Sequence, residues 1–177
     1  LHLDGARLFN AAVAQNVAAT EITRHFDSVS LCLSKGLGAP VGSALCGSRD
    51  FIEEARKWRK MCGGGMRQAG ILAAAALYAL ENNIERLADD HEHARLLAKG
   101  LSRISELSVA PDGAQTNMVF FTVDASTAKE LGNYLQEKNI LISAGPATRL
   151  VTHLGISKED IHYSLEQITT FFDSRQG

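Results

Sequence analysis

The sequence predicts a mixed α/β protein in two parts: α/β material in residues 1–90 and a small α+β domain in residues 91–177. Three observations lead to this prediction. In the first part a strand pattern, a helix-compatible stretch and a second strand pattern follow one another, in the order of a β-α-β unit. After residue 90 the pattern changes to short apolar strands that alternate with amphipathic helices. Finally, 177 residues, 45% of them hydrophobic, suffice for a core without disulfides.

The first strand is expected at Leu1–Leu3, with a turn at residues 4–5 that ends it. An Ala-rich helix follows at Leu8–Ala19, and a connection starts at Thr20. Ser28–Ser34 alternates small polar with apolar residues, which predicts the second strand of the unit.

Three glycines and a proline predict a loop at Lys35–Gly42, because neither helix nor strand tolerates them together. Ser43–Gly47 is expected to be a short returning strand, and Arg49–Met61 a helix with a strongly basic end. The stretch Met66–Glu81 is apolar nearly all round, which predicts a buried helix. Another helical pattern covers Ile84–Leu101.

In the second part, Ser157 precedes an acidic turn and can cap the free amides at the start of a helix. The expected strands are Val109, Met118–Val123, Leu141–Ile142 and Arg149–His153, and the expected helices are Ser126–Lys138 and Ser157–Phe172.

Composition excludes several classes of protein. A net charge of −2 argues against general nucleic-acid binding, which usually needs a basic face. Three widely spaced cysteines, with no C-x-x-C pair, argue against a disulfide framework or zinc site, and we expect them to be small core residues in a reducing, cytoplasmic compartment. No apolar run could span a bilayer. The chain starts without Met in a strand pattern, so we expect a piece of a longer polypeptide.

Lys35 is the first candidate for chemistry. It follows the second strand in a glycine-rich loop, where α/β sheets bind their ligands, and Ser34 adds a hydroxyl beside it. Desolvation there would favour the neutral amine that Schiff-base formation requires. A solvated lysine on a turn fits the same residues.

Asp4 is the second candidate. In a parallel β-α-β unit the ends of both strands face the same edge of the sheet, so Asp4 and Lys35 could line one pocket. A carboxylate there could hold a proton on a heteroaromatic nitrogen, as proteins do with pyridoxal phosphate. Arg7 could bind a carboxylate or phosphate. A plain turn and a surface arginine are the alternatives.

The only strong charge cluster surrounds Trp58 and three consecutive glycines. A basic helix end, a glycine nest and a helix start suit an anion such as phosphate. A solvated helix end fits equally well, whereas the net charge disfavours a nucleic-acid patch. The cations of this cluster are Arg56, Lys57, Arg59, Lys60 and Arg67.

Arg149 lies among apolar strand residues, and it must find a carboxylate or reach solvent. A structural salt bridge and a clamp for a substrate are both compatible with this position. His91, His93 and His162 are expected on polar, solvated helix faces, and no partner is evident for His153 in its strand.

Three motifs stand in a specific order: His2–Asn10 (HLDGARLFN), Leu31–Ser43 (LCLSKGLGAPVGS) and Arg59–Gln68 (RKMCGGGMRQ). With Asn117-Met118 and Arg149–His153, they resemble the low-specificity L-threonine aldolases, in the aldolase/β-eliminating-lyase branch of the fold-type-I pyridoxal-phosphate enzymes. The resemblance implies the C-terminal part of an aspartate-aminotransferase-type, cofactor-binding large domain in residues 1–90, and a small α+β domain in residues 91–177.

The resemblance also implies roles for residues. Pyridoxal phosphate would be the cofactor, Lys35 would bind it covalently, and Asp4 would pair with its pyridinium nitrogen. Arg149 would clamp the substrate carboxylate. No metal is implied. The other cofactor contacts would be Arg7, Ser34 and Arg67, and the other substrate contacts Arg7 and Lys60.

The implied reaction is the retro-aldol cleavage of L-threonine or L-allo-threonine to glycine and acetaldehyde, in threonine catabolism and glycine biosynthesis. Lys60 and Arg67 would reach a neighbouring subunit's active site, which implies a homo-oligomer, a dimer or tetramer, with shared sites. The family's phosphate cradle and two histidines precede the matching residues. Two alternatives stay open: another β-eliminating lyase of this fold that uses the same Lys35 and Asp4, and an inactive truncated homologue.

Overall fold

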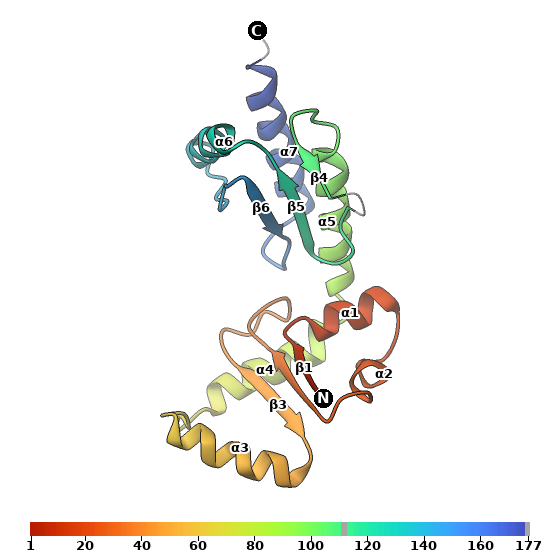
Figure 1. Cartoon of the computed structure of the whole chain (residues 1–177), viewed down its shortest axis with the longest axis vertical. Helices are drawn as coiled ribbons and strands as arrows, with labels where there is room; N and C mark the ends of the chain where they lie inside the picture. The colour runs from red at the N-terminus through yellow and green to blue at the C-terminus, as the bar shows by residue number, and fades with distance from the viewer. Residues whose placement is uncertain (111–112, 176–177) are drawn as a thin grey trace. The chain divides into compact units, whose positions relative to one another are not determined.

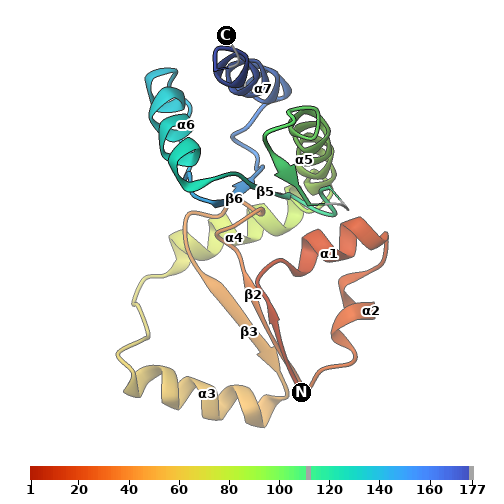
Figure 2. The ribbon, with the colours of Figure 1, turned by 45° about the horizontal axis from the view of Figure 1, so that its top comes forward.

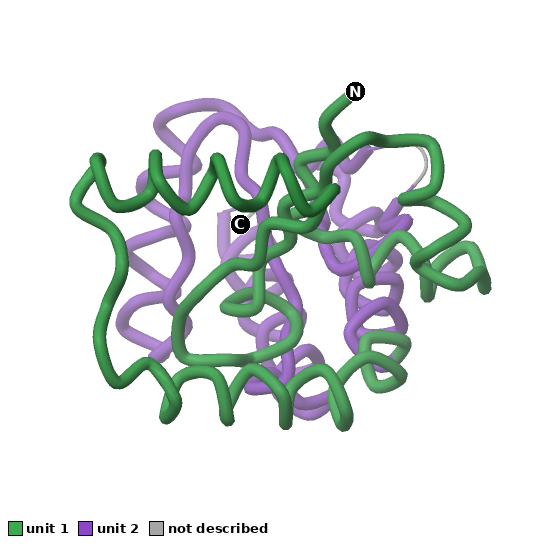
Figure 3. The backbone as a smooth tube through the Cα atoms, turned by 90° about the horizontal axis from the view of Figure 1, so that it is seen from below, with its two compact units in different colours: residues 1–88 green, residues 89–177 purple. Residues whose placement is uncertain are grey.

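The computed structural model describes residues 1–110 and 113–175. It consists of two compact units, unit 1 at Leu1–Ala88 and unit 2 at Asp89–Gly177, coloured separately in Figure 3. Each unit contains its own three-stranded sheet. Each is therefore described by itself.

The sheet of unit 1 is built from β1 (His2–Gly5), β2 (Ser28–Cys32) and β3 (Ser43–Gly47), in that order (Figure 1). β1 and β2 are parallel, and β3 returns antiparallel to β2. The expected β-α-β unit and returning strand are thus confirmed.

Two helices connect the parallel strands of unit 1. They are α1 (Leu8–Gln15) and α2 (Ala19–Thr23). Asn16 ends α1 in the left-handed region at φ 52°, where its backbone amide bonds back to the helix. The single helix predicted at Leu8–Ala19 therefore ends early, and a second helix starts at Ala19 and continues past Thr20, where the sequence had indicated a connection.

β1 runs through Gly5, so the expected turn at residues 4–5 is wrong. Gly5 pairs with Leu31 of β2. A Cβ atom on Gly5 would lie 2.7 Å from the backbone oxygen of Ser30, closer than real contacts allow. The glycine here permits close approach of two strands rather than a turn.

The helix α3 (Arg49–Met61) has the predicted bounds, and the Ser48 hydroxyl accepts a hydrogen bond from the Phe51 amide at 3.4 Å to cap it. The next helix, α4 (Gly70–Asn82), starts later than predicted. The backbone has positive φ at Gly65 (105°) and Gln68 (50°), which a right-handed helix cannot include.

The prediction that α4 is buried all round is wrong for this chain. Only Ala76 and Ala79 are buried. Ile71 is 82% exposed, and Leu77 and Tyr78 are also largely exposed. The small core of unit 1 therefore uses one side of α4; its buried members are Leu33, Leu37, Ala39, Ala76, Ala79 and Leu87.

Unit 2 is a two-layer structure. Its antiparallel sheet has the order β4 (Ser108–Val109), β5 (Met118–Thr122) and β6 (Ala147–Val151). Three helices cover one face of this sheet (Figure 2). They are α5 (Leu87–Leu101), α6 (Ala125–Glu137) and α7 (Lys158–Asp173).

The core of unit 2 lies between this sheet and its helices. Val119 and Phe121 point inward from β5, and Leu131 and Leu135 of α6 pack with them. The expected strand at Leu141–Ile142 is absent, and Leu141 is 81% exposed. Ile140 and Ile142 pack their side chains against the core of unit 2, but the backbone of this segment does not pair with the sheet.

Two expectations about side-chain exposure are wrong. His91 is only 1% exposed, and burial, followed by the charge of Arg95, lowers its pKa from the ordinary 6.5. Cys46 and Cys62 are exposed and Cys32 is half-buried, so none of the cysteines is a core residue.

Candidate active site

The parallel pair β1/β2 places Asp4 and the loop containing Lys35 at one edge of the sheet of unit 1. Asp4 lies one residue before the carboxyl end of β1 and pairs with Ser30, two residues before the carboxyl end of β2. Ser34 and Lys35 follow directly beyond that end. The edge expected from the β-α-β pattern therefore exists, with both groups on it.

Asp4 presents its carboxylate to solvent at this edge. One oxygen, Oδ1, accepts a hydrogen bond from the backbone amide of Ala6 at 3.2 Å, which holds the side chain against the start of the helix connection. The other oxygen of this exposed, oriented carboxylate can accept a hydrogen bond from a protonated nitrogen. This is the chemistry proposed for Asp4 from the sequence.

Arg7 gives an independent indication that a group belongs here. Its side chain is half-buried, and its Nε atom finds no hydrogen-bond partner among the residues that the structure describes. A buried guanidinium nitrogen without a partner is costly, so an additional acceptor at this position would stabilise it. A carboxylate or phosphate oxygen is such an acceptor.

The glycine-rich loop has a defined shape. The Leu33 amide donates to the Gly42 carbonyl at 3.0 Å, and the Ala39 amide to the Leu33 carbonyl at 3.0 Å. Leu33, Leu37 and Ala39 are buried and anchor the loop in the core of unit 1. The ends of the loop are thereby fixed, and Ser34 and Lys35 remain exposed.

Gly36 lets this loop approach its neighbours closely. A Cβ atom there would lie 2.9 Å from Leu87 Cδ2 and 3.2 Å from Asn10 Nδ2. Lys35 itself makes no ion pair and no side-chain hydrogen bond among the described residues, and its backbone carbonyl accepts from Gly38 at 2.8 Å. The loop holds the backbone of Lys35 while its amine stays available.

Lys60 and Arg67 lie elsewhere in unit 1. Lys60 is in the last turn of α3, which follows the far end of β3, and Arg67 is in the segment between α3 and α4 (Figure 2). Both side chains are exposed. Within this chain the structure does not bring these two cations to the edge that carries Asp4 and Lys35.

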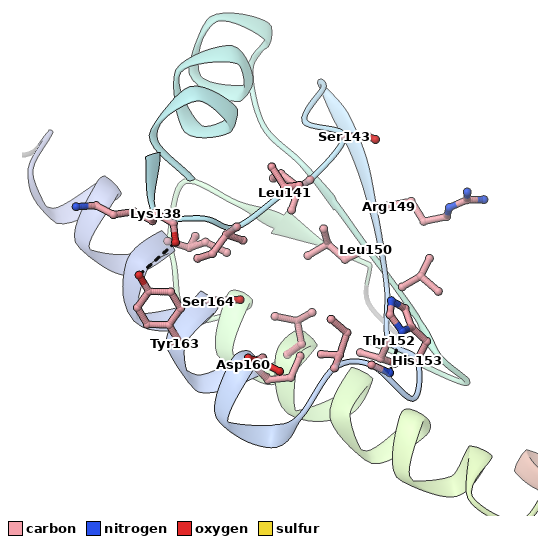
Figure 4. A pocket seen from close by; sticks show the side chains of 18 of the residues that line it. Lys138, Leu141, Ser143, Arg149, Leu150, Thr152, His153, Asp160, Tyr163 and Ser164 are labelled. Carbon is pink, nitrogen blue, oxygen red and sulfur yellow. Dashed lines mark hydrogen bonds between the residues drawn. The ribbon is translucent and has the colours of Figure 1, made fainter. Parts of the chain in front are cut away.

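Arg149 belongs to unit 2, in the middle of β6, opposite Phe120 of β5. Its side chain is exposed and projects on the opposite side of the strand from Leu150 (Figure 4). No ion pair of Arg149 is found in the described part of the chain. The sequence left two alternatives for Arg149, a structural salt bridge and a clamp for a substrate. The described residues of unit 2 provide no partner for the salt bridge.

Arg149 lines the rim of a cavity of about 1110 Å³ in unit 2. The cavity lies between β6, α7 and the segment 139–143, and its wall mixes aliphatic with polar side chains. At its border the Tyr163 hydroxyl donates to the Lys138 carbonyl at 3.3 Å (Figure 4). Asp160 also borders it, but its Oδ2 accepts from the Ser157 amide at 2.8 Å, and this bond lowers the Asp160 pKa.

The sequence missed a buried polar cluster behind β6. Asn117 and Thr152 are each 2% exposed. The Asn117 Nδ2 group donates to the Thr152 carbonyl at 2.9 Å, and the Thr152 hydroxyl donates to the Asp90 carbonyl at 2.6 Å. The only sequence signal was a threonine at an inward position of an apolar strand. His153, next in the chain, accepts at Nδ1 from the Gly155 amide at 3.1 Å.

No group of three or more His, Cys, Asp or Glu side chains among the described residues is arranged to hold a metal ion. No helix in residues 1–110 or 113–175 has the length and apolar character that crossing a membrane requires.

Comparison with known proteins identifies relatives along most of the chain. Residues 1–126 match the β-eliminating lyase family. The low specificity L-threonine aldolase of Escherichia coli K12 is 52% identical over 161 residues, which cover 91% of this chain and 47% of that protein. Low-specificity L-threonine aldolase 1 of Arabidopsis thaliana is 47% identical over 170 residues, covering 93% and 48%.

Solved structures share the fold. A putative aromatic amino acid β-eliminating lyase/threonine aldolase from Exiguobacterium gives a TM-score of 0.83 at 24% identity, over 97% of this chain and 52% of the other. A putative L-allo-threonine aldolase from Listeria monocytogenes gives 0.80 at 25% identity, over 98% and 51%. These likenesses confirm the predicted partial fold-type-I architecture.

The chain spans about half the length of the curated relatives that it matches. The family match covers residues 1–126, which include Asp4, Arg7, Lys35 and the whole of unit 1. On this match, the chain belongs to the β-eliminating lyase family.

Proposed function

We propose that this chain is part of a pyridoxal-phosphate-dependent aldolase that cleaves L-threonine or L-allo-threonine to glycine and acetaldehyde. The observation that carries the proposal is the edge of the parallel pair β1/β2, where an exposed, oriented carboxylate and the loop of an unpaired lysine occur together. The 52% identity to the E. coli aldolase over 91% of this chain supports the same activity.

The residues at this edge fit the cofactor. The unpartnered Arg7 Nε can donate to an anionic oxygen, and the Lys35 amine is available for a covalent bond, so neither contact would displace an existing one. When bound, pyridoxal phosphate supplies an electron sink for the pair released from the Cα–Cβ bond of the substrate. Lys35 would hold the group covalently, and Ser34 and Arg67 would add polar contacts.

Asp4 would hold a proton on the ring nitrogen. The bond from the Ala6 amide fixes Oδ1 and so orients the whole carboxylate. Arg7 would lie beside the ring and, with Lys60, would contact the polar groups of the substrate. Arg149, extended from the open face of the sheet of unit 2, would bind the substrate carboxylate with its planar pair of donors.

In the same proposal, residues 1–90 are the C-terminal part of the cofactor-binding domain and residues 91–177 are the small domain. The enzyme would be a cytoplasmic homodimer or homotetramer in threonine breakdown and glycine formation. Lys60 and Arg67 are exposed and away from the Asp4 edge, which is compatible with a role in a partner's site.

Borohydride reduction of the complete, cofactor-loaded enzyme, followed by peptide mapping, tests the assignment of Lys35. The pyridoxyl adduct is expected on the peptide that contains Lys35 and is expected to be absent after Lys35→Arg. An adduct on Lys60 would contradict the assignment.

A second measurement distinguishes binding of the cofactor from turnover of the substrate. Asp4→Asn should retain the bound cofactor, seen by its absorbance, but lose most turnover of threonine, because the ring nitrogen loses its carboxylate partner. Near-normal turnover in Asp4→Asn would contradict the role of Asp4. Adduct formation without any cleavage of threonine or allo-threonine by the unmodified enzyme would refute the proposed activity.

A further inference from the structure

The face on which Arg149 lies depends on the register of β6. Thr148 and Leu150 of this strand, and Thr152 directly after it, point toward the core, whereas Arg149 points outward. Because side chains alternate along a strand, a slip of one residue would turn Arg149 into the core. Whatever fixes the register therefore also fixes the position of the guanidinium group.

Three hydrogen bonds of Thr152 hold the chain in place at the end of β6. The Thr152 amide donates to the Asn117 carbonyl at 3.0 Å, which closes the ladder between β5 and β6. The Asn117 side-chain amide donates to the Thr152 carbonyl at 2.9 Å. The Thr152 hydroxyl donates to the Asp90 carbonyl at 2.6 Å, in the first half of α5.

The burial of this cluster makes its geometry selective. Thr152 and Asn117 are each 2% exposed, and Asp90 is fully buried. A hydroxyl buried to this extent needs a hydrogen-bond partner inside the protein, and in a slipped register the inward position would be filled by Val151 or His153 instead. The bond from Thr152 to Asp90 thus ties one register of β6 to the helix layer.

We propose that Thr152 is a positioning residue for substrate binding: its buried hydroxyl locks β6 onto α5 and so holds Arg149 where it can bind the substrate carboxylate. This inference rests on the proposed function, in which Arg149 contacts that carboxylate. Thr148 cannot replace the lock, because its hydroxyl bonds only within the preceding turn, to the carbonyl of Gly145 at 2.9 Å.

The test uses the complete, cofactor-loaded enzyme. Glycine is the ligand that carries a carboxylate, and methylamine, an amine without a carboxylate, is the control ligand. Calorimetry measures the dissociation constant of each. Thr152→Val removes the hydroxyl and keeps the shape, Thr152→Ser restores the hydroxyl, and Thr127→Val makes the same change at a buried threonine of α6. Cofactor absorbance and circular dichroism verify that each variant is loaded and folded.

Thr152→Val should weaken glycine binding about tenfold, the effect of about one lost hydrogen bond, and leave methylamine binding unchanged. Thr152→Ser and Thr127→Val should bind glycine as the unmodified enzyme does. In an Arg149→Ala background Thr152→Val should cause no further weakening, because residues that act through one another are not additive. If Thr152→Val does not fold, Thr152→Ala replaces it with the same expectation.

The outcomes separate this inference from the proposed function. Unchanged glycine binding in Thr152→Val, or equal weakening of glycine and methylamine, would overturn the positioning role while leaving the aldolase proposal intact. Equal weakening by Thr152→Val in the presence and absence of Arg149 would also overturn it. Normal glycine binding in Arg149→Ala alone would remove Arg149 from the substrate site, and the inference would fail with that assignment.

Discussion

Replacing Gly5 by alanine should loosen the parallel strand pair that carries Asp4. The added Cβ atom would lie 2.7 Å from the Ser30 carbonyl oxygen, 3.2 Å from Val29 Cγ1 and 3.3 Å from Leu8 Cβ. The first of these neighbours is backbone in a paired strand and cannot rotate away. β1 must therefore move from β2, and Asp4, next in the strand, must move with it.

The size of the effect follows from the contacts. Overpacking against rigid neighbours costs about 1–3 kcal/mol. At about 2 kcal/mol, local opening of the strand pair would become about 30-fold more frequent. Gly70→Ala is the matched control, because nothing lies within 4 Å of its added Cβ atom in this chain, and it should be neutral or stabilise α4 by up to about 1 kcal/mol.

Hydrogen–deuterium exchange followed by mass spectrometry measures this opening unit by unit. In Gly5→Ala, amides of β1 and β2 should exchange faster, while amides of β4, β5 and β6 should exchange as in the unmodified protein. Unchanged exchange in β1 and β2, or the same acceleration in Gly70→Ala, would refute the argument from close approach.

Two further predictions concern unit 2. Burial holds the pKa of His91 below the ordinary 6.5, so below that pH the unfolded chain binds a proton that the folded chain does not. The free energy of unfolding should therefore be highest above about pH 6.5 and should fall as the pH drops below it. Urea unfolding of unit 2 at about pH 8 and about pH 5 should show this loss, and a His91→Gln variant with an equal loss would contradict it. Ser157→Ala should destabilise α7 by about 1 kcal/mol, because the Ser157 hydroxyl accepts a hydrogen bond from the Asp160 amide at 3.1 Å. Hydrogen–deuterium exchange should then be faster in the first turn of α7. Ser174→Ala, at the other end of α7, is the control and should leave exchange in that turn unchanged.

Several local elements of this protein follow from its sequence alone. The helix at Arg49–Met61 has the predicted bounds because Ser48 caps its start and three glycines follow its end. The glycines and the proline of Lys35–Gly42 exclude helix and strand by their own backbone preferences, so the loop needed no tertiary information. The alternation in β6 likewise places Arg149 on the side opposite its buried neighbours.

The position of Asp4 and Lys35 at one edge was also predictable, because β-α-β units have one handedness and one direction. The family resemblance then assigned these residues their roles, which the geometry of the edge supports and which the experiments above test.

Only the tertiary structure decided which apolar and polar groups are buried. The pattern of α4 shows apolar residues on all sides, but the chain offers a packing partner to one side only, so Ile71 is exposed. His91 lies in a polar stretch of sequence and is nevertheless only 1% exposed. The bond from Thr152 to Asp90 joins residues far apart in the chain. Local sequence patterns report backbone preference and amphipathicity, whereas contacts between distant segments depend on how those segments pack.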